Sequence, residues 1–539
     1  MAPPSGSSAS SPFPEVLAAI DIGTNSIHMV VARVAGNDRF EVITRQKEMV
    51  RLGSGQGEMK HLEPDAIDRS IEALTRCRQL AESFDATVFA VATSAVREAR
   101  NAAEFLDRAR SESRVVVDVV PGHEEARLIR LGVLQALPLW ERDMVLFDVG
   151  GGSTEVVFGR GEDISYARSI KLGSLRMTRS FFPDGQVGST AVQECRRYVR
   201  ARLAPMLRDA TTLPFEVAVA SSGTAETLAA MALSRDGGSL PQTLNGAVVT
   251  RDALAEVIDD LAAAASNDER RSLPGMDPAR ADILLGGGIV VEQLCDALGI
   301  VELVISEYAL REGVLLDGLH RLRGGSLHRL STLREESVTH LMELCDDDPG
   351  HSFQVKDLAL RLCDALGDRL GLDDSDRELL NAGALLANVG LFVSHSAHHK
   401  HSYYVIRNSE HLMGFTDREI ELIAQVARYH RKGRPSEKHP EFASLAPEDQ
   451  ARVRAMVALL RVAIGMDRNH DRAVADLEVS QRDGVVRIVM VPRSMADGSV
   501  SDLSLERHTA SERSGLLAEE LGVSVEITVA GSDESGQDP

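Results

Sequence analysis

The sequence predicts an α/β protein with two similar lobes, followed by a helical region and a small α/β domain. Three observations lead to this prediction: a glycine-centred motif that occurs twice, helical periodicity beyond residue 325, and short apolar strands near the end. A chain of 539 residues exceeds what one core usually needs, so several domains are expected. We place them at 1–14 (disordered tail), 15–138 (first lobe), 139–324 (second lobe), 325–475 (helical domain), 476–530 (small α/β cap) and 531–539 (disordered tail).

The repeated motif is a strand ending in Asp, a turn of Gly and polar residues, and a second strand. It reads AAIDIGTNS from Ala18 and VLFDVGGGST from Val145. Short runs rich in Val, Ile and Phe on both sides of each turn predict β-hairpins. Because the motif occurs twice, we expect two α/β lobes facing each other across a cleft, each contributing one loop.

A hairpin at these positions excludes two common phosphate-binding motifs. P-loops and dinucleotide fingerprints require a helix directly after their glycines, and GxxxxGK[ST] occurs nowhere in the chain. A glycine hairpin can still offer bare backbone N–H groups and hydroxyls to phosphate oxygens. Either hairpin alone could be a plain Asp-x-Gly turn, but the repetition favours a paired phosphate site.

Composition limits the partners and the compartment. The values of 43% hydrophobic and 26% charged residues are those of a globular protein, and no apolar run approaches the ~20 residues of a membrane helix. The N-terminus lacks a secretory signal, and the five scattered cysteines form no CxxC pair, so we expect a cytoplasmic protein. A net charge of −22 disfavours nonspecific nucleic-acid binding, so a phosphate-rich substrate would need local basic clusters.

Two further motifs, ATSAVREA from Ala92 and PGHEEARLI from Pro121, complete a resemblance to a known family. Over residues 15–530 the chain resembles the exopolyphosphatase and guanosine pentaphosphate phosphohydrolase family. This resemblance implies two actin-like lobes of the ribonuclease H type, as in sugar kinases and chaperone ATPases. It also implies phosphoanhydride hydrolysis and a homodimer.

The resemblance further implies that Glu125 is the catalytic carboxylate that positions or deprotonates water. From spacing alone, Glu124 and Glu125 would only be acidic residues favouring a helix N-terminus. Asp148 and Glu155 lie seven residues apart on opposite strands of the second hairpin, so both are expected to hold Mg²⁺ or its water shell, with Asp21 as a weaker partner. A solvent-facing strand position is the alternative for Glu155.

The phosphate itself is expected to meet a guanidinium and the two turns. Arg97 follows a strand at the start of a predicted helix, where it can grip phosphate in bidentate fashion, although surface ion pairing is the usual fate of a lone Arg. The predicted cradle consists of Thr24, Asn25, Ser26, Gly151, Gly152 and Ser153. Further glycine turns at 221–224 and 286–288 fall where relatives of this fold hold adenosine.

Beyond residue 325, amphipathic stretches at 333–345, 351–370, 374–388 and 417–430 predict helices. They resemble the HD-type domain of longer family members, but Ala387 and Asn388 replace its metal-binding His-Asp pair, so metal catalysis is not expected there. Uneven spacing and the missing acidic partner also disfavour zinc at His395, His398, His399 and His401. After these helices we expect two strands, a helix over 507–521 and a strand over 523–529.

The most basic region lies in this helical part. Its residues could form a track for a long polyphosphate chain, or an ordinary solvated face. The predicted track residues are Lys400, Arg407, Arg431, Lys432 and Arg434.

The leading hypothesis is a processive exopolyphosphatase that uses Mg²⁺. The nearest alternative, hydrolysis of the 5′ phosphate of guanosine pentaphosphate (pppGpp), uses the same motifs, and the basic track favours the polymer. A nonenzymatic phosphate or nucleotide sensor is disfavoured by the intact acidic residues Glu125, Asp148 and Glu155. A kinase of the same fold would need an acceptor site, for which we find no signature.

Overall fold

The structure is a computed structural model that divides into two compact units, Met1–Leu330 and Ser331–Pro539. The predicted tails 1–14 and 531–539 lie outside the described residues. The residues described are 16–35, 39–54, 60–161, 163–183, 185–210, 212–235, 240–241, 243–322, 328–409, 411–412, 415–431, 433–482, 484–494 and 499–530. In this part of the chain, no helix is both long and apolar enough to cross a membrane.

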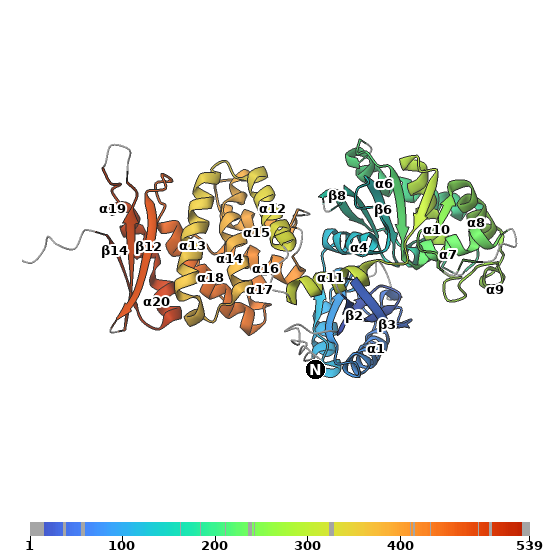
Figure 1. Ribbon diagram of the computed structural model, residues 1–539, viewed down its shortest axis with the longest axis horizontal. Helices are drawn as coiled ribbons and strands as arrows, with labels where there is room; N and C mark the ends of the chain where they lie inside the picture. The colour runs from blue at the N-terminus through green and yellow to red at the C-terminus, as the bar shows by residue number, and fades with distance from the viewer. Residues whose placement is uncertain are drawn as a thin grey trace, which may run out of the picture. The chain divides into compact units, whose positions relative to one another are not determined.

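The first sheet of the first unit has the strand order β3-β2-β1-β4-β5. Figure 1 labels its neighbouring strands β2 and β3. Strand β1 pairs antiparallel with β2 and parallel with β4, because a tight turn joins β1 to β2 and a helix intervenes before β4. Its strands are β1 (Val16–Ile22), β2 (Ile27–Ala35), β3 (Arg39–Glu48), β4 (Thr87–Ala92) and β5 (Val117–Val119). The helical segments around it are η1 (Leu52–Ser54), α1 (Pro64–Glu82), α2 (Ser94–Glu98), α3 (Ala102–Arg108) and η2 (Ala109–Ser113).

The second sheet repeats this pairing, in the order β10-β11-β9-β6-β7-β8. Strands β8-β7-β6-β9-β11 correspond one by one to β3-β2-β1-β4-β5, with the same parallel and antiparallel pairs. The strands are β6 (Met144–Val149), β7 (Thr154–Arg160), β8 (Asp163–Ile170), β9 (Val217–Ser221), β10 (Val248–Thr250) and β11 (Glu302–Ile305). The helices are α5 (Ser174–Phe181), α6 (Ser189–Ala210), α7 (Ser222–Ser234), α8 (Arg251–Ala263), α9 (Asn267–Arg271) and α10 (Leu284–Leu298). Both predicted hairpins and the duplication are therefore confirmed.

Two helices, α4 (Gly122–Ala136) and α11 (Leu310–Leu322), join the two lobes. Helix α4 precedes the second sheet in sequence yet packs on β7 and β8, whereas α11 follows that sheet and packs on β1. The helices touch through Gly132 and Gly313, where an added Cβ would overlap the facing backbone. The resulting core contains apolar residues from both lobes, so the lobes form one folded body.

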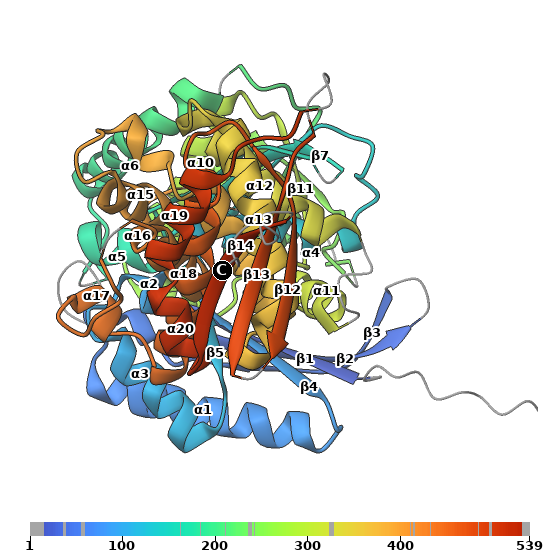
Figure 2. The ribbon, with the colours of Figure 1, turned by 90° about the vertical axis from the view of Figure 1, so that its left-hand side faces the viewer.

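The second unit begins with a helical layer. Its segments are α12 (His328–Cys345), α13 (Pro349–Leu370), α14 (Asp374–Leu385), η3 (Val389–Phe392), α15 (His398–Arg407), α16 (Asp417–Arg428), α17 (Pro440–Ala443) and α18 (Pro447–Gly465). A three-stranded sheet in the order β12-β13-β14 follows, with its strands side by side in Figure 2. Helices and sheet share one hydrophobic core.

The sheet consists of β12 (Val474–Arg482), β13 (Val485–Pro492) and β14 (Ser524–Val529), with α19 (Ser504–Arg513) and α20 (Gly515–Leu521) between β13 and β14. The single helix predicted over 507–521 is therefore wrong, since the chain divides into two helices at Ser514. The order of strand, strand, helical segment and strand is confirmed.

Candidate functional site

The two hairpin turns have the same backbone geometry and lie against each other. The N–H of Gly23 donates to the carbonyl of Ser26 at 3.0 Å, and the N–H of Gly150 donates to that of Ser153 at 3.0 Å. A Cβ added to Gly152 would meet Thr24 Oγ1 at 2.7 Å, so the first turn leaves no space for a side chain there. Glycine in the second turn thus allows the two loops to approach.

The two turns line a cavity of about 470 Å³ in the first unit. The structure brings together most of the predicted site residues on its walls. These are Asp21, Thr24, Asn25, Ser26, Glu125, Asp148, Gly151, Gly152 and Ser153. Of the predicted residues of this site, Arg97 and Glu155 do not line the cavity.

Arg97 lies behind Glu125 instead of facing the cavity. Its Nη1 donates to Glu125 Oε2 at 2.7 Å and to the carbonyl of Val120 at 2.8 Å. Arg97 is also in the last turn of α2, not at its start, because this helix has only five residues. Its first contact is therefore the predicted catalytic carboxylate.

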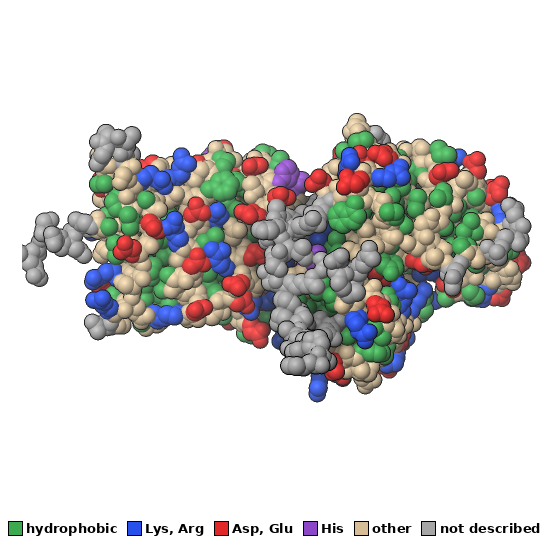
Figure 3. Space-filling model, in the orientation of Figure 1, with side chains coloured by type: hydrophobic (Ala, Val, Ile, Leu, Met, Phe, Trp, Pro, Cys, Tyr) green, Lys and Arg blue, Asp and Glu red, His purple; other side chains and the backbone are tan. Residues whose placement is uncertain are grey.

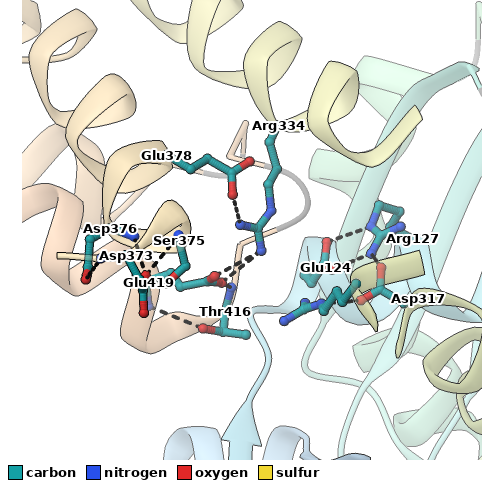
Figure 4. A network of polar contacts seen from close by, with 11 residues as sticks. Glu124, Arg127, Asp317, Arg334, Asp373, Ser375, Asp376, Glu378, Thr416 and Glu419 are labelled. Atoms are coloured by element: carbon teal, nitrogen blue, oxygen red, sulfur yellow. Dashed lines mark hydrogen bonds and ion pairs between the residues drawn. The ribbon is translucent and has the colours of Figure 1, made fainter. Parts of the chain in front are cut away.

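Glu125 lies in the first turn of α4 and is buried. Burial raises the pKa of its carboxyl group, and the charge and hydrogen bond of Arg97 lower it. The neighbouring Glu124 has a different role, since it accepts hydrogen bonds from Arg127 at 2.7 and 2.8 Å (Figure 4). Arg127 also donates to Asp317 of α11 at 2.6 Å, so Glu124 belongs to a buried ion network between α4 and α11.

Asp148 and Glu155 are direct cross-strand partners, as predicted from their spacing. Ser221 pairs with Asp148 on one side, and Ser169 pairs with Glu155 on the other, which gives a row across four strands. Ser221 Oγ donates to Asp148 Oδ2 and Ser169 Oγ donates to Glu155 Oε1, each at 2.6 Å. Each carboxylate is therefore oriented by one hydroxyl group.

Asp21 and Asp148 are acids of raised pKa. Burial raises the pKa of Asp21 to about 7, with Arg311 opposing the shift, and that of Asp148 to about 6, with the Ser221 hydrogen bond opposing it. Oδ1 of Asp21 is buried without a hydrogen-bond partner, although carboxylate oxygens are strong acceptors. Such an atom suits a cation or a water molecule that a cation holds.

The hydroxyl of Ser26 is oriented by His28, which the sequence reasoning missed. Arg311 Nη1 lies 3.1 Å from His28 Nδ1, and a guanidinium can only donate, so Nδ1 is the acceptor. Burial lowers the pKa of His28 well below its usual value, so the ring is neutral and carries its proton on Nε2. Nε2 then donates to Ser26 Oγ at 2.7 Å, which leaves the Ser26 hydroxyl proton available to a phosphate oxygen.

Four cationic side chains on the cavity wall were also not identified from the sequence. These are Arg45, Lys47, Arg280 and Arg311. Arg280 lies over Gly223, where any Cβ would overlap its guanidinium group. The hairpin repeat could have revealed His28 and Lys47. His28 has the same position in the first hairpin as Glu155 has in the second. Lys47 pairs with His28 across β2 and β3.

The predicted glycine turn at 286–288 is wrong, because these residues lie inside α10. Added Cβ atoms at Gly286 and Gly287 would meet Ser174 O and Thr224 Cγ2 at 2.8 and 2.7 Å. The glycines thus serve close helix packing. The other predicted turn, 221–224, forms the junction of β9 and α7 and contributes Ser222 and Gly223 to the cavity wall.

In the second unit, two residues of the predicted polyphosphate track have acidic partners. Arg407 pairs with Asp417 at 2.9 Å and Glu421 at 2.6 Å, and Arg434 pairs with Glu519 at 2.6 Å. Lys432 lies outside the described residues. Over the face drawn in Figure 3, basic and acidic side chains are interspersed on this unit.

The second unit also contains a buried arginine with a carboxylate on each side. Arg334 of α12 donates to Glu378 at 2.7 Å and to Glu419 at 3.0 Å (Figure 4). Glu419 additionally closes the capping box of α16 with Thr416. These contacts join α12, α14 and α16 and assign Arg334 a structural role.

The two lobes bring two phosphate-type turns into contact, and a glutamate paired with an arginine lies beside them. This arrangement is typical of an enzyme that acts on phosphate groups. In agreement, residues 29–322 match the model of the Ppx/GppA phosphatase family, and residues 333–492 match Ppx/GppA phosphatase, domain III. The chain belongs to the Ppx/GppA phosphatase family and is therefore a phosphoanhydride hydrolase.

Among its relatives is the guanosine-5′-triphosphate,3′-diphosphate pyrophosphatase of Photobacterium profundum. It is 28% identical over 463 residues, which cover 85% of this chain and 88% of the relative. The Vibrio vulnificus protein of the same name is 27% identical over 83% of this chain and 86% of its own. The crystal structure of an exopolyphosphatase from Cytophaga hutchinsonii, 27% identical with a TM-score of 0.53, covers 57% of this chain and 98% of its own.

Proposed function

We propose that the protein is a Mg²⁺-dependent exopolyphosphatase that releases orthophosphate from the end of inorganic polyphosphate. The observation that supports this most strongly is the lining of the cavity. The wall carries two phosphate-type turns and the cations Lys47, Arg280 and Arg311, and none of the described lining residues is Phe, Tyr or Trp. Nucleobase pockets are usually apolar or aromatic, whereas a phosphate chain requires N–H donors and positive charge.

In the proposed reaction, water attacks the terminal phosphorus and the bond to the bridging oxygen breaks. Glu125 accepts the proton of the attacking water, and the shortened chain leaves with the electrons of the broken bond. Arg97 holds Glu125 at 2.7 Å, and burial raises the pKa of Glu125 against the opposing charge of Arg97, which makes the carboxylate a stronger base. The turn N–H groups and the Ser26 hydroxyl orient the phosphate for attack.

The residues present fit a magnesium ion. Among the described residues no three His, Cys, Asp or Glu side chains form a ready-made metal centre. Mg²⁺ commonly binds through one or two carboxylates, substrate phosphates and retained waters, so Asp148 and Asp21 would hold it, with Glu155 as the cross-strand partner of Asp148. When bound, it neutralises phosphate charge. The unpartnered Oδ1 of Asp21 supports this assignment.

The second candidate substrate is pppGpp. The relatives of similar length are named guanosine-5′-triphosphate,3′-diphosphate pyrophosphatases. The carboxylates of Glu226, Asp277 and Glu307 on the cavity wall could accept N–H groups of a guanine edge, and they would repel a phosphate chain. The acids and the cations are neighbours on this wall, since Arg280 pairs with Asp277 at 3.6 Å, so the substrate assay decides between the two candidates.

The test is phosphate release by the purified full-length protein with Mg²⁺, from long-chain polyphosphate and from pppGpp at equal phosphate concentration. We expect a higher kcat/KM for the polymer, with both activities lost in Glu125→Gln. A higher kcat/KM for pppGpp would assign the second candidate. If the parent unfolds cooperatively on heating, and so is folded, but releases phosphate from neither substrate, both substrate proposals fail.

The duplicated sheets support the actin-like assignment of the two lobes, which we include in the proposal. The family resemblance further suggests an HD-like origin of the helical layer and a homodimer in the cytoplasm. Sedimentation equilibrium of the full-length protein measures the oligomeric state, and a mass near 58.3 kDa would exclude the dimer.

A further inference from the structure

Four described arginines of the second unit lie near one another. Arg461 lies in α18, Arg468 follows α18, Arg513 ends α19, and Arg431 follows α16. Helix α18 packs against both α16 and α19, and Nη1 of Arg461 donates to the carbonyl of Gly433, two residues after Arg431. The charges of Arg431, Arg461 and Arg468 all act on Arg513. In the described part of the chain, none of the four forms an ion pair, whereas Arg434 and Arg454 pair with Glu519 and Glu520 at 2.6 and 3.6 Å.

Two of these arginines have buried N–H groups without an acceptor. Nε of Arg461 and Nη1 of Arg513 are inaccessible to solvent and lack a hydrogen-bond partner. Arg461 is only partly satisfied, since its Nη1 donates to the carbonyl of Gly433 at 3.2 Å. Nδ1 of His399 on α15 is also buried and unpaired. Unsatisfied N–H donors such as those of Arg461 and Arg513 are rare in protein interiors and indicate an absent acceptor.

The positive charges also act on one another. Burial lowers the pKa of Arg513, and the charges of Arg468, Arg461 and Arg431 lower it further, with only Glu512 opposing them. An arginine cannot relieve such repulsion by losing its proton. A bound anion can, and its oxygens would also supply the absent acceptors.

A metal ion suits this region less well. Nε2 of His398 lies 3.1 Å from Nε2 of His430, and each ring places Nδ1 near a backbone carbonyl, as metal-binding histidines often do. The neighbouring guanidinium charges would repel a cation, and Arg431 is the residue after His430. The charge of the cluster therefore favours an anion.

We propose that Arg431, Arg461, Arg468 and Arg513, with His399 beside them, bind a compact phosphate anion of the size of orthophosphate or pyrophosphate. Arginine forks bind phosphate oxygens in bidentate fashion, and two exposed arginines beside two half-buried ones suit a small anion at the surface of the unit. The site differs from the predicted surface track, of which it shares only Arg431. It goes beyond the proposed function and does not depend on it, because it lies in the unit without Glu125.

The test is hydrogen–deuterium exchange of the full-length Glu125→Gln variant, with and without pyrophosphate. We expect slower amide exchange around residues 428–434, 459–470 and 505–515. Replacing Arg461 or Arg468 by Gln should raise the pyrophosphate concentration needed for half-maximal protection about tenfold or more. Each substitution removes charge-assisted hydrogen bonds to the anion. Arg468 is exposed, so Arg468→Gln tests the proposal even if Arg461→Gln does not fold.

The matched control is Arg487→Gln, which removes the same charge from an exposed residue of β13 that pairs with Glu526 at 3.2 Å. It should leave the protection unchanged, and an equal loss there would overturn the site in favour of general charge. Absence of protection in these segments, while the turns near residues 23 and 150 are protected, would also overturn it. Protection by GDP as well as pyrophosphate would extend the ligand to phosphate esters, and protection by pyrophosphate alone would restrict it to inorganic phosphates.

Discussion

The two hairpins of the first unit share a backbone but carry different side chains. The row across the first sheet is Val91, Asp21, His28 and Lys47. The corresponding row across the second sheet is Ser221, Asp148, Glu155 and Ser169. At the position after the common Asp, one lobe has a neutral histidine followed by a lysine, and the other has a second acid followed by a serine.

This difference separates two tasks between the lobes. In the second lobe, two hydroxyls orient two carboxylates, an arrangement suited to a hydrated cation and to water. In the first lobe, His28 orients a hydroxyl and Lys47 adds positive charge at the cavity, an arrangement suited to phosphate. A duplicated backbone thus places equivalent positions face to face, and the side chains determine what each lobe binds.

The largest expected effect is at the carboxylate between the lobes. Glu125→Gln should lower kcat for phosphate release about a thousandfold, because an amide cannot accept the proton of the attacking water. Glu124→Gln is the matched control. It should cost about 3 kcal/mol of unfolding free energy, since it breaks a buried ion network, and leave kcat of the folded enzyme intact. Equal kcat losses in both variants would contradict the separate roles of the two residues.

The next largest effects are expected at Glu155 and His28, which have corresponding positions in the two rows. Glu155→Gln should lower kcat about a hundredfold, because it removes a carboxyl group from the acidic row and changes its contact with Ser169. His28→Gln should mainly raise KM, because Ser26 loses its fixed donor. Steady-state kinetics on the proposed substrate measures both. If His28→Gln lowers kcat as much as Glu155→Gln does, the lobes do not divide the tasks in this way.

A smaller effect is expected at the cationic end of the first row. Lys47→Met should raise KM about tenfold with little change in kcat, since an exposed ammonium contributes binding more than chemistry. Arg33→Met on β2 removes the same charge from an exposed residue paired with Glu41 at 3.8 Å, and should change KM little. Equal increases in both variants would indicate long-range charge instead of a contact at Lys47.

A further effect concerns the stability of the metal-free protein. The pKa of Asp21 is raised to about 7, so the folded state binds its proton more tightly than the unfolded state does. Its contribution to stability is therefore lost as the pH rises from about 4 to about 7. In EDTA, Asp21→Asn should raise the free energy of unfolding by about 4 kcal/mol at pH 8 and by almost nothing at pH 4.

Urea titrations at the two pH values measure this difference. Asp107→Asn, at an exposed position of α3, is the control and should show no such dependence. A gain for Asp21→Asn at pH 4 that equals the gain at pH 8 would show that the carboxylate charge is not its cause.

Much of the first unit could be predicted because its signals are local. The hairpin turns close through hydrogen bonds between residues three apart, such as Gly23 and Ser26, and glycine is required within the same few residues. The pairing of Asp148 with Glu155 follows from that turn. The glycines at 286–288 misled the prediction because glycine favours both turns and close packing, and only the neighbours of α10 determine which applies.

The sequence by itself determined the two hairpins, the duplication, the family and the position of Glu125 at the start of a helix. Only the tertiary structure decided that Arg97 holds Glu125 instead of facing the cavity, that Ser169 and Ser221 orient the two acids, and that His28 orients Ser26. These contacts depend on strand register and helix packing between segments far apart in the chain. Local propensity carries no information about such contacts, because they form only when the apolar faces of both sheets are buried around α4 and α11.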